Sequence, residues 1–301
     1  MKTSTAEIFE IADASLSTSR VRDYYELTKP RMNFLVVITT MVGFCMASRG
    51  QVDWLLLFHT VVGTAMTASC AAVLNQILER RLDLLMPRTA DRPVAAGRVG
   101  VSEAAIYGIA LGILGVGYLL IAVNPLTAML GLATLALYIL VYTPLKRFTS
   151  LNTVVGAIPG AIPPLMGFTG ASNVITVDAI AVFAILFFWQ MPHFLAIAIL
   201  YKRDYQAAGF KMLPCLEEDL HLTNRMILLY TAALMPVSLL PGLLGMSGVI
   251  YLTAAVLLGF GFCCSAITCV STRTRSDARQ LFFASIIYLP LLLGFMMFDK
   301  V

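Results

Sequence analysis

Residues 54–93 read WLLLFHTVVGTAMTASCAAVLNQ and then ILERRLDLLMPRTADRP, so an apolar run turns into a charged one. The first part, 54–76, contains no Lys, Arg, Asp or Glu. A helix of roughly 20 such residues is long enough to cross the hydrocarbon core of a bilayer. The stretch therefore predicts a membrane-spanning helix that carries polar and charged groups at its C-terminal end.

The rest of the chain repeats this apolar pattern. The 301 residues are 59% hydrophobic and 13% charged, with a mean hydropathy of +0.84, far more apolar than a soluble domain. The expected fold class is an all-α integral membrane protein of about nine transmembrane helices, in one domain over 31–301 behind a polar N-terminal tail, 1–30. Runs long enough to span a bilayer lie at 33–49, 54–76, 104–122, 125–142, 152–169, 176–200, 224–242, 247–270 and 280–298.

The basic residues predict the orientation, because Lys and Arg accumulate in the cytoplasmic loops of membrane proteins. With the N-terminus inside, only Arg49 and Lys300 of the 21 Lys and Arg residues fall outside. The N-terminal tail carries Glu7, Glu10 and Asp13 and lacks an apolar core, unlike a signal or transit peptide. We therefore expect a bacterial inner membrane with cytoplasmic charged loops. The net charge of +4 reflects this topology, and no nucleic-acid partner is expected.

A polar stripe follows the apolar run of the second span. Asn75, Glu79 and Asp83 recur every four residues, so on a helix each is rotated only ~40° from the last and all three share a face. Carboxylate and amide oxygens are the ligands that Mg²⁺ takes. Because Asn75 and Asp83 lie ~12 Å apart along the axis, two ions bridged by a diphosphate fit better than one ion.

Two arginines follow the stripe at the same spacing. Arg88 and Arg92 offer the planar fork that binds phosphate oxygens. We expect the helix to continue against the bundle until Pro87 breaks it. The apolar residues expected to hold it there lie beside the stripe and are Leu78, Leu82 and Leu85.

The alternative for this segment is an ordinary solvated helix end. Local ion pairs such as Glu79 with Arg80 or Asp83 with Arg88 would then occupy the charges, at little gain in stability. The four-residue register, the uncharged Asn75 at the deepest position and the arginines downstream favour the metal and diphosphate site.

A second charged loop, YKRDYQAAGFKMLP at 201–214, follows the sixth span. Its one carboxylate, Asp204, lies in the same expected compartment as Asp83. Asp204 is a candidate to complete the metal site, with Lys202 or Lys211 neutralising phosphate charge, although a surface salt bridge fits this residue equally well. A third loop contributes Lys146 as a further phosphate ligand, although topology alone also predicts a base there.

Two features within the spans point to a second ligand. Pro192 precedes His193, whose imidazole is suited to bind a ring-shaped or metal-containing acceptor, with simple packing as the alternative. In the fifth span, three prolines predict a broken or bent helix that lines a wide apolar cavity. These are Pro159, Pro163 and Pro164.

Two motifs resemble those of the intramembrane prenyltransferases of the UbiA superfamily, and within it the heme O synthase branch. They are Asn75-x3-Glu79-x3-Asp83-x2-Met86-x-Arg88-Thr89-x2-Arg92-Pro93 and Tyr201-x2-Asp204-Tyr205-x2-Ala208-Gly209-x2-Met212-Leu213-Pro214. Segments 27–31, 142–147, 160–167 and 189–194 extend the resemblance over nearly the whole chain. The superfamily's second motif usually carries two acids four apart, whereas Ala208 follows Asp204 here, as in the heme-prenylating branch.

The resemblance implies nine helices around a lipid-accessible cavity, and transfer of a farnesyl group from farnesyl diphosphate to a vinyl group of protoheme IX (heme b), giving heme O. It also implies roles for the site residues. Mg²⁺ would be held by Asn75, Glu79, Asp83 and Asp204, the three acids being catalytic. The diphosphate would be held by Arg88, Arg92, Lys146, Lys202 and Lys211, and heme by His193.

Two other functions stay open. A related prenyltransferase would act on a quinone or chlorin precursor. A transporter would also suit broken helices and an intramembrane histidine, but it predicts charges paired deep within the spans. Membrane lipid is an expected partner, and oxidase-assembly proteins or a second copy of the chain are left open.

Overall fold

The computed structural model describes residues 19–48 and 50–301, so residues 1–18 of the predicted tail, together with Arg49, lie outside the described residues. Within that part of the chain, nine helical segments are long and apolar enough to cross a membrane, as predicted. Eight of them are single helices: α2 (Pro30–Ala47), α3 (Trp54–Asp83), α4 (Val101–Ala122), α7 (Asn152–Ser172), α8 (Val177–Leu200), α10 (His221–Leu243), α11 (Val249–Thr272) and α12 (Arg275–Phe298). The other, Pro125–Leu145, combines α5 (Pro125–Ala136), the π-helix η1 (Leu137–Tyr142) and α6 (Thr143–Leu145).

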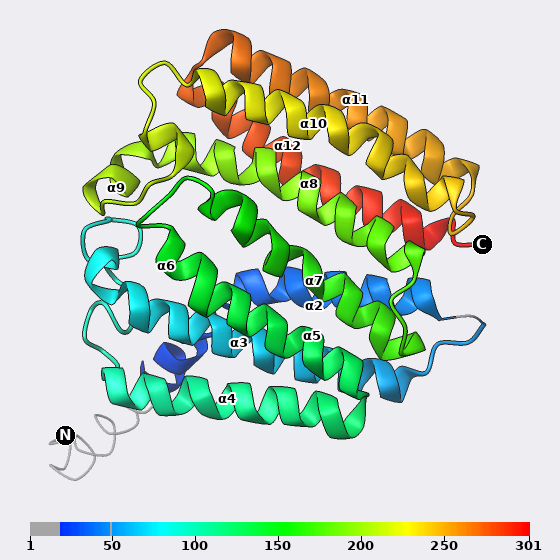
Figure 1. Ribbon diagram of the computed structural model, residues 1–301, viewed down its shortest axis with the longest axis horizontal. Coiled ribbons are helices and arrows are strands. Elements are labelled where there is room, and N and C mark those ends of the chain that lie inside the picture. The colour runs from blue at the N-terminus through cyan, green and yellow to red at the C-terminus, as the bar shows by residue number, and fades with distance from the viewer. Residues whose placement is uncertain (1–18, 49) are drawn as a thin grey trace, which may run out of the picture.

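The long helices run side by side, with their connections gathered at two opposite ends (Figure 1). Helix α3 packs against α4 and α2, α2 packs against α7, and α7 packs against α8. On the other side of the bundle, α10 and α12 pack against α8, and α11 packs against α10 and α12. The short helix α9 (Lys202–Ala207) lies at the end where α3 and α8 finish. The two loops with the charged motifs are therefore at the same end of the bundle.

Helices α2 and α7 approach so closely that their backbones touch at glycines. A Cβ added to Gly43 would lie 2.2 Å from the carbonyl oxygen of Pro164, and one added to Gly167 would lie 2.0 Å from that of Thr40. Small residues allow such contact between membrane helices, where packing replaces the hydrophobic effect as the driving force. Helix α7 is the most deeply buried of the spans among the described residues.

The three prolines of the fifth span do not break it. Helix α7 runs without interruption from Asn152 to Ser172, so of the predicted broken or bent helix the break does not occur. Neighbouring helices can satisfy the backbone groups that prolines free within a membrane, and α7 is enclosed by α2, α3, α5 and α8. The irregular backbone occurs instead in the fourth span, where η1 comes directly before Thr143 and Pro144.

The first charged loop, 84–98, is fixed on two sides. Its Arg98 donates hydrogen bonds to Asp23 at 2.7 Å and Glu26 at 2.8 Å, both in the helical segment 19–27. Its Met86 is buried in a cluster with Ala198 of α8 and with residues of the second charged loop, Ala208, Phe210 and Met212. The two charged loops are therefore packed together although more than 100 residues separate them.

Candidate active site

The polar stripe is buried at the end of α3. Asn75, Glu79 and Asp83 are 1%, 5% and 0% exposed, respectively, and occupy one face of the helix. A buried amide and two buried carboxylates are costly unless each has a partner. The stripe therefore depends on side chains from other segments.

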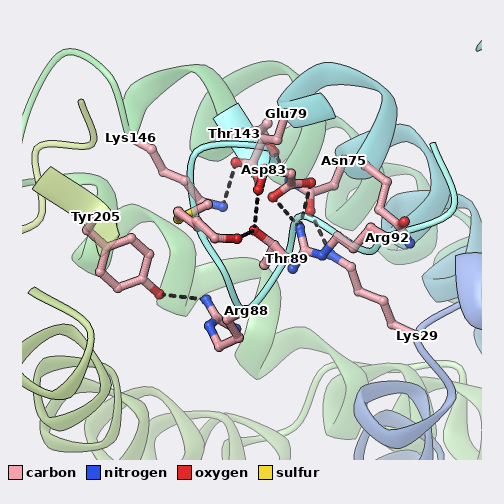
Figure 2. A network of polar contacts seen from close by, with 12 residues as sticks. Lys29, Asn75, Glu79, Asp83, Arg88, Thr89, Arg92, Thr143, Lys146 and Tyr205 are labelled. Carbon is pink, nitrogen blue, oxygen red and sulfur yellow. Dashed lines mark hydrogen bonds and ion pairs between the residues drawn. The ribbon is translucent and has the colours of Figure 1, made fainter. Parts of the chain in front are cut away.

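Each residue of the stripe has one basic partner, and Figure 2 shows the three bases converging on it. Lys29 donates to Asn75 Oδ1 at 2.6 Å, and Lys146 donates to Glu79 Oε1 at 2.8 Å. Asp83 accepts both of its bonds from Arg92 Nη1, at 2.7 and 2.8 Å. Three segments thus meet at α3: the residue before α2, the residue after α6 and the loop 84–98.

The structure differs from the sequence expectations for this segment in three respects. Neither local pair of the solvated-end alternative forms, because Glu79 pairs with Lys146 and Asp83 with Arg92. The helix also ends at Asp83, four residues before Pro87. Two of the three leucines that were expected to hold the helix against the bundle, Leu78 and Leu85, are each 53% exposed. They face outward, whereas the stripe faces inward. In a bilayer the apolar face of a helix turns to lipid and its polar face turns to the protein.

The site carries more positive than negative charge. Four bases, Lys29, Arg88, Arg92 and Lys146, accompany the two carboxylates of Glu79 and Asp83. Burial and the nearby guanidinium of Arg92 lower the pKa of Lys29 to about 7. An anion bound among these bases would relieve that cost.

The pKa of Lys146 is shifted in the opposite direction from that of Lys29. Burial acts to lower the pKa of its amine, but Glu79, Tyr142 and Tyr138 together outweigh burial and the pKa is raised. The amine also lies 4.5 Å from the centre of the Tyr142 ring. Lys146 therefore keeps its charge next to the stripe.

Arg88 joins the two charged loops. Its Nη2 lies 3.4 Å from Tyr205 Oη, and its guanidinium carbon lies 4.9 Å from the centre of the Tyr201 ring. Within the described part of the chain Arg88 makes no hydrogen bond or ion pair with the stripe, so one predicted phosphate-binding arginine pairs with a carboxylate and the other contacts the second loop.

The predicted site residues of the second loop differ in their exposure and in their contacts. Asp204 is half-buried in α9, and within residues 19–48 and 50–301 its carboxylate has no hydrogen-bond or ion-pair partner. Lys202 donates to the carbonyl oxygen of Glu217 at 2.5 Å, away from the stripe. Lys211 is exposed, but its backbone N–H donates to the carbonyl of Lys146 at 2.8 Å and so anchors that residue.

A family model described as the UbiA prenyltransferase family matches residues 36–287. The chain belongs to the UbiA prenyltransferase family. Its curated relatives include the protoheme IX farnesyltransferases of Solibacter usitatus (46% identical, covering 93% of this chain and 99% of the relative) and Koribacter versatilis (42% identical, covering 94% of each). As a member of this family with nine apolar spans, the chain is a multi-pass membrane protein.

Solved structures of UbiA homologues share the fold. Digeranylgeranylglyceryl phosphate synthase superposes with a TM-score of 0.79 at 16% identity, covering 93% of this chain and 98% of that one. A UbiA homologue from Archaeoglobus fulgidus, bound to GPP and Mg²⁺, has a TM-score of 0.68 at 17% identity, covering 91% and 99%. Both confirm the all-α architecture predicted from the apolar spans.

The donor set of the UbiA-type site fits a divalent metal. The stripe presents an amide oxygen and two carboxylates, the oxygen ligands that Mg²⁺ takes. Among the described residues, no three His, Cys, Asp or Glu side chains lie close enough to hold an ion without movement. Basic side chains occupy the stripe oxygens instead, so a metal would take the places that Lys29, Lys146 and Arg92 fill.

His193 lies apart from this UbiA-type site, in α8, and faces α12. Its imidazole Nδ1 is 2.7 Å from Ser285 Oγ, and its ring is stacked against Trp189 and Phe282, with centroids 5.0 and 5.1 Å away. The side chain is half-buried, so it is not enclosed within the packing. The predicted heme ligand thus lies between two aromatic rings where α8 meets α12.

Lys29 contacts the stripe, although the sequence indicated it only as a cytoplasmic base within segment 27–31. Its backbone occupies the left-handed region, with φ of 49°, directly before Pro30. A side-chain-bearing residue holds that conformation only where its surroundings fix it. The sequence signal was a lysine next to a helix-starting proline, and only the packing of α2 on α3 shows that it reaches Asn75.

Proposed function

We propose that this chain transfers a farnesyl group from farnesyl diphosphate to a vinyl group of protoheme IX and releases heme O. The observation that carries the proposal is the buried stripe of Asn75, Glu79 and Asp83 with a cation on each member. It supplies both the oxygens for a metal and the bases for a diphosphate. The curated relatives named protoheme IX farnesyltransferases supply the choice of substrates.

The bases change partner when the substrate binds. In the structure Arg92 neutralises Asp83 and Lys146 neutralises Glu79. A diphosphate at the mouth offers these cations a more highly charged acceptor, with the bidentate geometry that arginine favours. Their release leaves the oxygens of Glu79 and Asp83 free.

The freed oxygens, with Asn75, would hold Mg²⁺, and Asp204 would approach from the second loop. The bound metal would supply neutralisation of the diphosphate, making it a better leaving group. Lys29, Arg88 and Arg92 would stabilise the negative charge that grows on the diphosphate oxygen as the carbon–oxygen bond breaks. Lys202 is bound to a backbone carbonyl and Lys211 is exposed, so we assign them outer roles in attracting the anion.

The bond changes require no strong base within the membrane. The bond between C1 of the farnesyl group and oxygen breaks, and its electron pair leaves with the diphosphate. The vinyl π pair of the porphyrin forms the new carbon–carbon bond to the allylic cation. Water then adds to the remaining porphyrin-side cation and loses a proton, giving a hydroxyethylfarnesyl group. The apolar walls would exclude water from the first cation.

His193 would bind the acceptor heme through its imidazole. It lies seven residues before the end of α8, ~10 Å along the helix axis, and Asn75 lies eight residues before the end of α3, ~12 Å. Both helices end next to the packed loops, so the two residues have similar depths. A heme held there would lie at a depth similar to that of the diphosphate site.

The proposed location is a bacterial inner membrane, with the N-terminus and both charged loops in the cytoplasm. The distribution of basic residues supports this, because only Arg49 and Lys300 fall on the opposite side. Lys300 donates to the carbonyls of Cys45 and Ser48 at the C-terminal end of α2, the end away from the stripe.

The test is an assay of purified protein with farnesyl diphosphate and heme b, with and without Mg²⁺, and products identified by mass spectrometry. We expect heme O only when Mg²⁺ is present. Full activity in EDTA would contradict the metal assignment. Prenylation of a quinone or chlorin precursor but not of heme b would show that the acceptor is not heme. Substrate flux into liposomes without chemical conversion would favour a transporter.

A further inference from the structure

Ser285 of α12 is fully buried and holds three hydrogen bonds at the interface with α8. Its hydroxyl donates to the carbonyl of Phe282 at 2.5 Å, and His193 Nδ1 lies 2.7 Å from the same hydroxyl oxygen. Its carbonyl accepts the indole N–H of Trp189 at 2.8 Å. Both Trp189 and His193 therefore bind one residue of the facing helix.

These contacts determine the protonation of the imidazole. A serine hydroxyl has one proton to donate, and here it is directed to the Phe282 carbonyl. We therefore assign Ser285 Oγ as the acceptor toward His193, which places the donated proton on His193 Nδ1. In the neutral ring the other nitrogen, Nε2, then keeps its lone pair.

The orientation of the ring is fixed as well. Trp189 stacks on the imidazole at an interplanar angle of 21°, and Phe282 stacks on it at 28°. Trp189 is itself held by its bond to the Ser285 carbonyl. Ring rotation about the Cβ–Cγ bond would break both the hydrogen bond and the stacking, so Nε2 keeps one direction.

We propose that Ser285 is a positioning residue, which holds His193 as the Nδ1-protonated tautomer with Nε2 presented to the iron of the acceptor heme. This inference rests on the proposed function, because it needs heme as the acceptor. Histidines that bind metals regularly donate their other N–H to an oxygen, which fixes the tautomer and raises the basicity of the binding nitrogen. A packing role alone would need only a small side chain at position 285.

The experiment titrates ferric heme b into the purified full chain and follows the Soret band and the electron paramagnetic resonance signal. Wild type should show imidazole ligation, and His193→Ala should lose it. Ser285→Ala should weaken heme affinity by about tenfold, at the lower end of the effect of removing such an orienting partner. Ser285→Thr keeps the hydroxyl and should restore both affinity and spectrum.

The double variant separates positioning from packing. In the His193→Ala background, Ser285→Ala should cause no further loss of heme affinity, because the pair acts as a unit. An equal loss in both backgrounds, or a wild-type spectrum and affinity in Ser285→Ala, would overturn the inference. A chain that neither binds heme b nor farnesylates it would refute the proposed function as well. A wild type that does both, with Ser285→Ala unchanged, would refute only the role of Ser285.

Discussion

The two halves of the candidate site differ in how far they are assembled before a ligand binds. On α3 the carboxylates of Glu79 and Asp83 are buried and each is held by a cation. On the second loop Asp204 is half-buried, without a side-chain partner in the described part of the chain, and Lys211 is exposed. The charged groups of the α3 half are paired with one another, whereas, among the described residues, the charged side chains of the second loop that were predicted to bind metal or phosphate are not paired with the α3 half.

This difference follows from burial. A carboxylate enclosed by protein must be paired because its desolvation is costly, whereas a carboxylate at a wet surface needs no partner. The α3 half should therefore contribute to both stability and catalysis. The Asp204 carboxylate of the second loop should contribute to catalysis alone.

Asp83→Asn should have the largest effect. It removes the charge that pairs with Arg92 and leaves that guanidinium without a counter-ion in a partly buried position. We expect farnesyl transfer to fall by on the order of 10³, as for loss of a preorganised electrostatic group. The melting temperature should also fall, because breaking such a pair strands a charge. Product formation and thermal unfolding in detergent measure the two effects.

Asp91→Asn is the matched control for this variant. Asp91 belongs to the same loop, its side chain is 95% exposed, and it pairs with Arg98 outside the stripe. Its replacement should leave both transfer rate and melting temperature close to wild type. Equal losses in the two variants would show that the loop, and not the buried pair, is being disturbed.

Asp204→Asn should separate catalysis from stability. We expect a loss of transfer on the order of 10², as for removal of one group that stabilises the reacting charges. The Mg²⁺ concentration for half-maximal rate should rise. Because the Asp204 carboxylate has no partner in the described structure, the melting temperature should not change. An Mg²⁺ titration of the initial rate checks this, with Glu218→Gln, an exposed acid of the following segment, as control.

The sequence predicted what depends on local pattern. Apolar run length located all nine spans, and four-residue spacing placed Asn75, Glu79 and Asp83 on one face. It did not predict which base pairs with which oxygen, because Lys29 and Lys146 come from segments 46 and 67 residues away from their partners.

Two other features escaped the sequence for the same reason. The direction of the leucines beside the stripe depends on which face of α3 meets lipid, and both faces contain apolar residues. Ser285 is one serine within an apolar span, and its contact with His193 exists only because α12 packs on α8. Pairings between distant segments are properties of the fold and leave no periodic signal in the chain.

Arg88→Lys tests the junction between the two halves. Lysine keeps the charge but lacks the planar guanidinium that donates two parallel hydrogen bonds. Binding of the diphosphate and the contacts with the second loop should therefore both weaken. We expect KM for farnesyl diphosphate to rise by about tenfold, as for loss of one charge-assisted hydrogen bond. Steady-state kinetics with varied farnesyl diphosphate measure it. A fall in kcat with unchanged KM would instead place Arg88 on the reacting bond.

The smallest expected effects concern the residues that hold Arg88. Tyr201→Leu removes the ring beneath the guanidinium and should raise KM for farnesyl diphosphate by about threefold, the size of one exposed cation–π contact. Tyr205→Phe removes only a 3.4 Å hydrogen bond, which is long for a strong interaction, so KM should change by less than about twofold. The reverse order of effects would mean that the Tyr205 hydroxyl directs Arg88. The second loop would then be more closely assembled with α3 in the working enzyme than its open charges indicate.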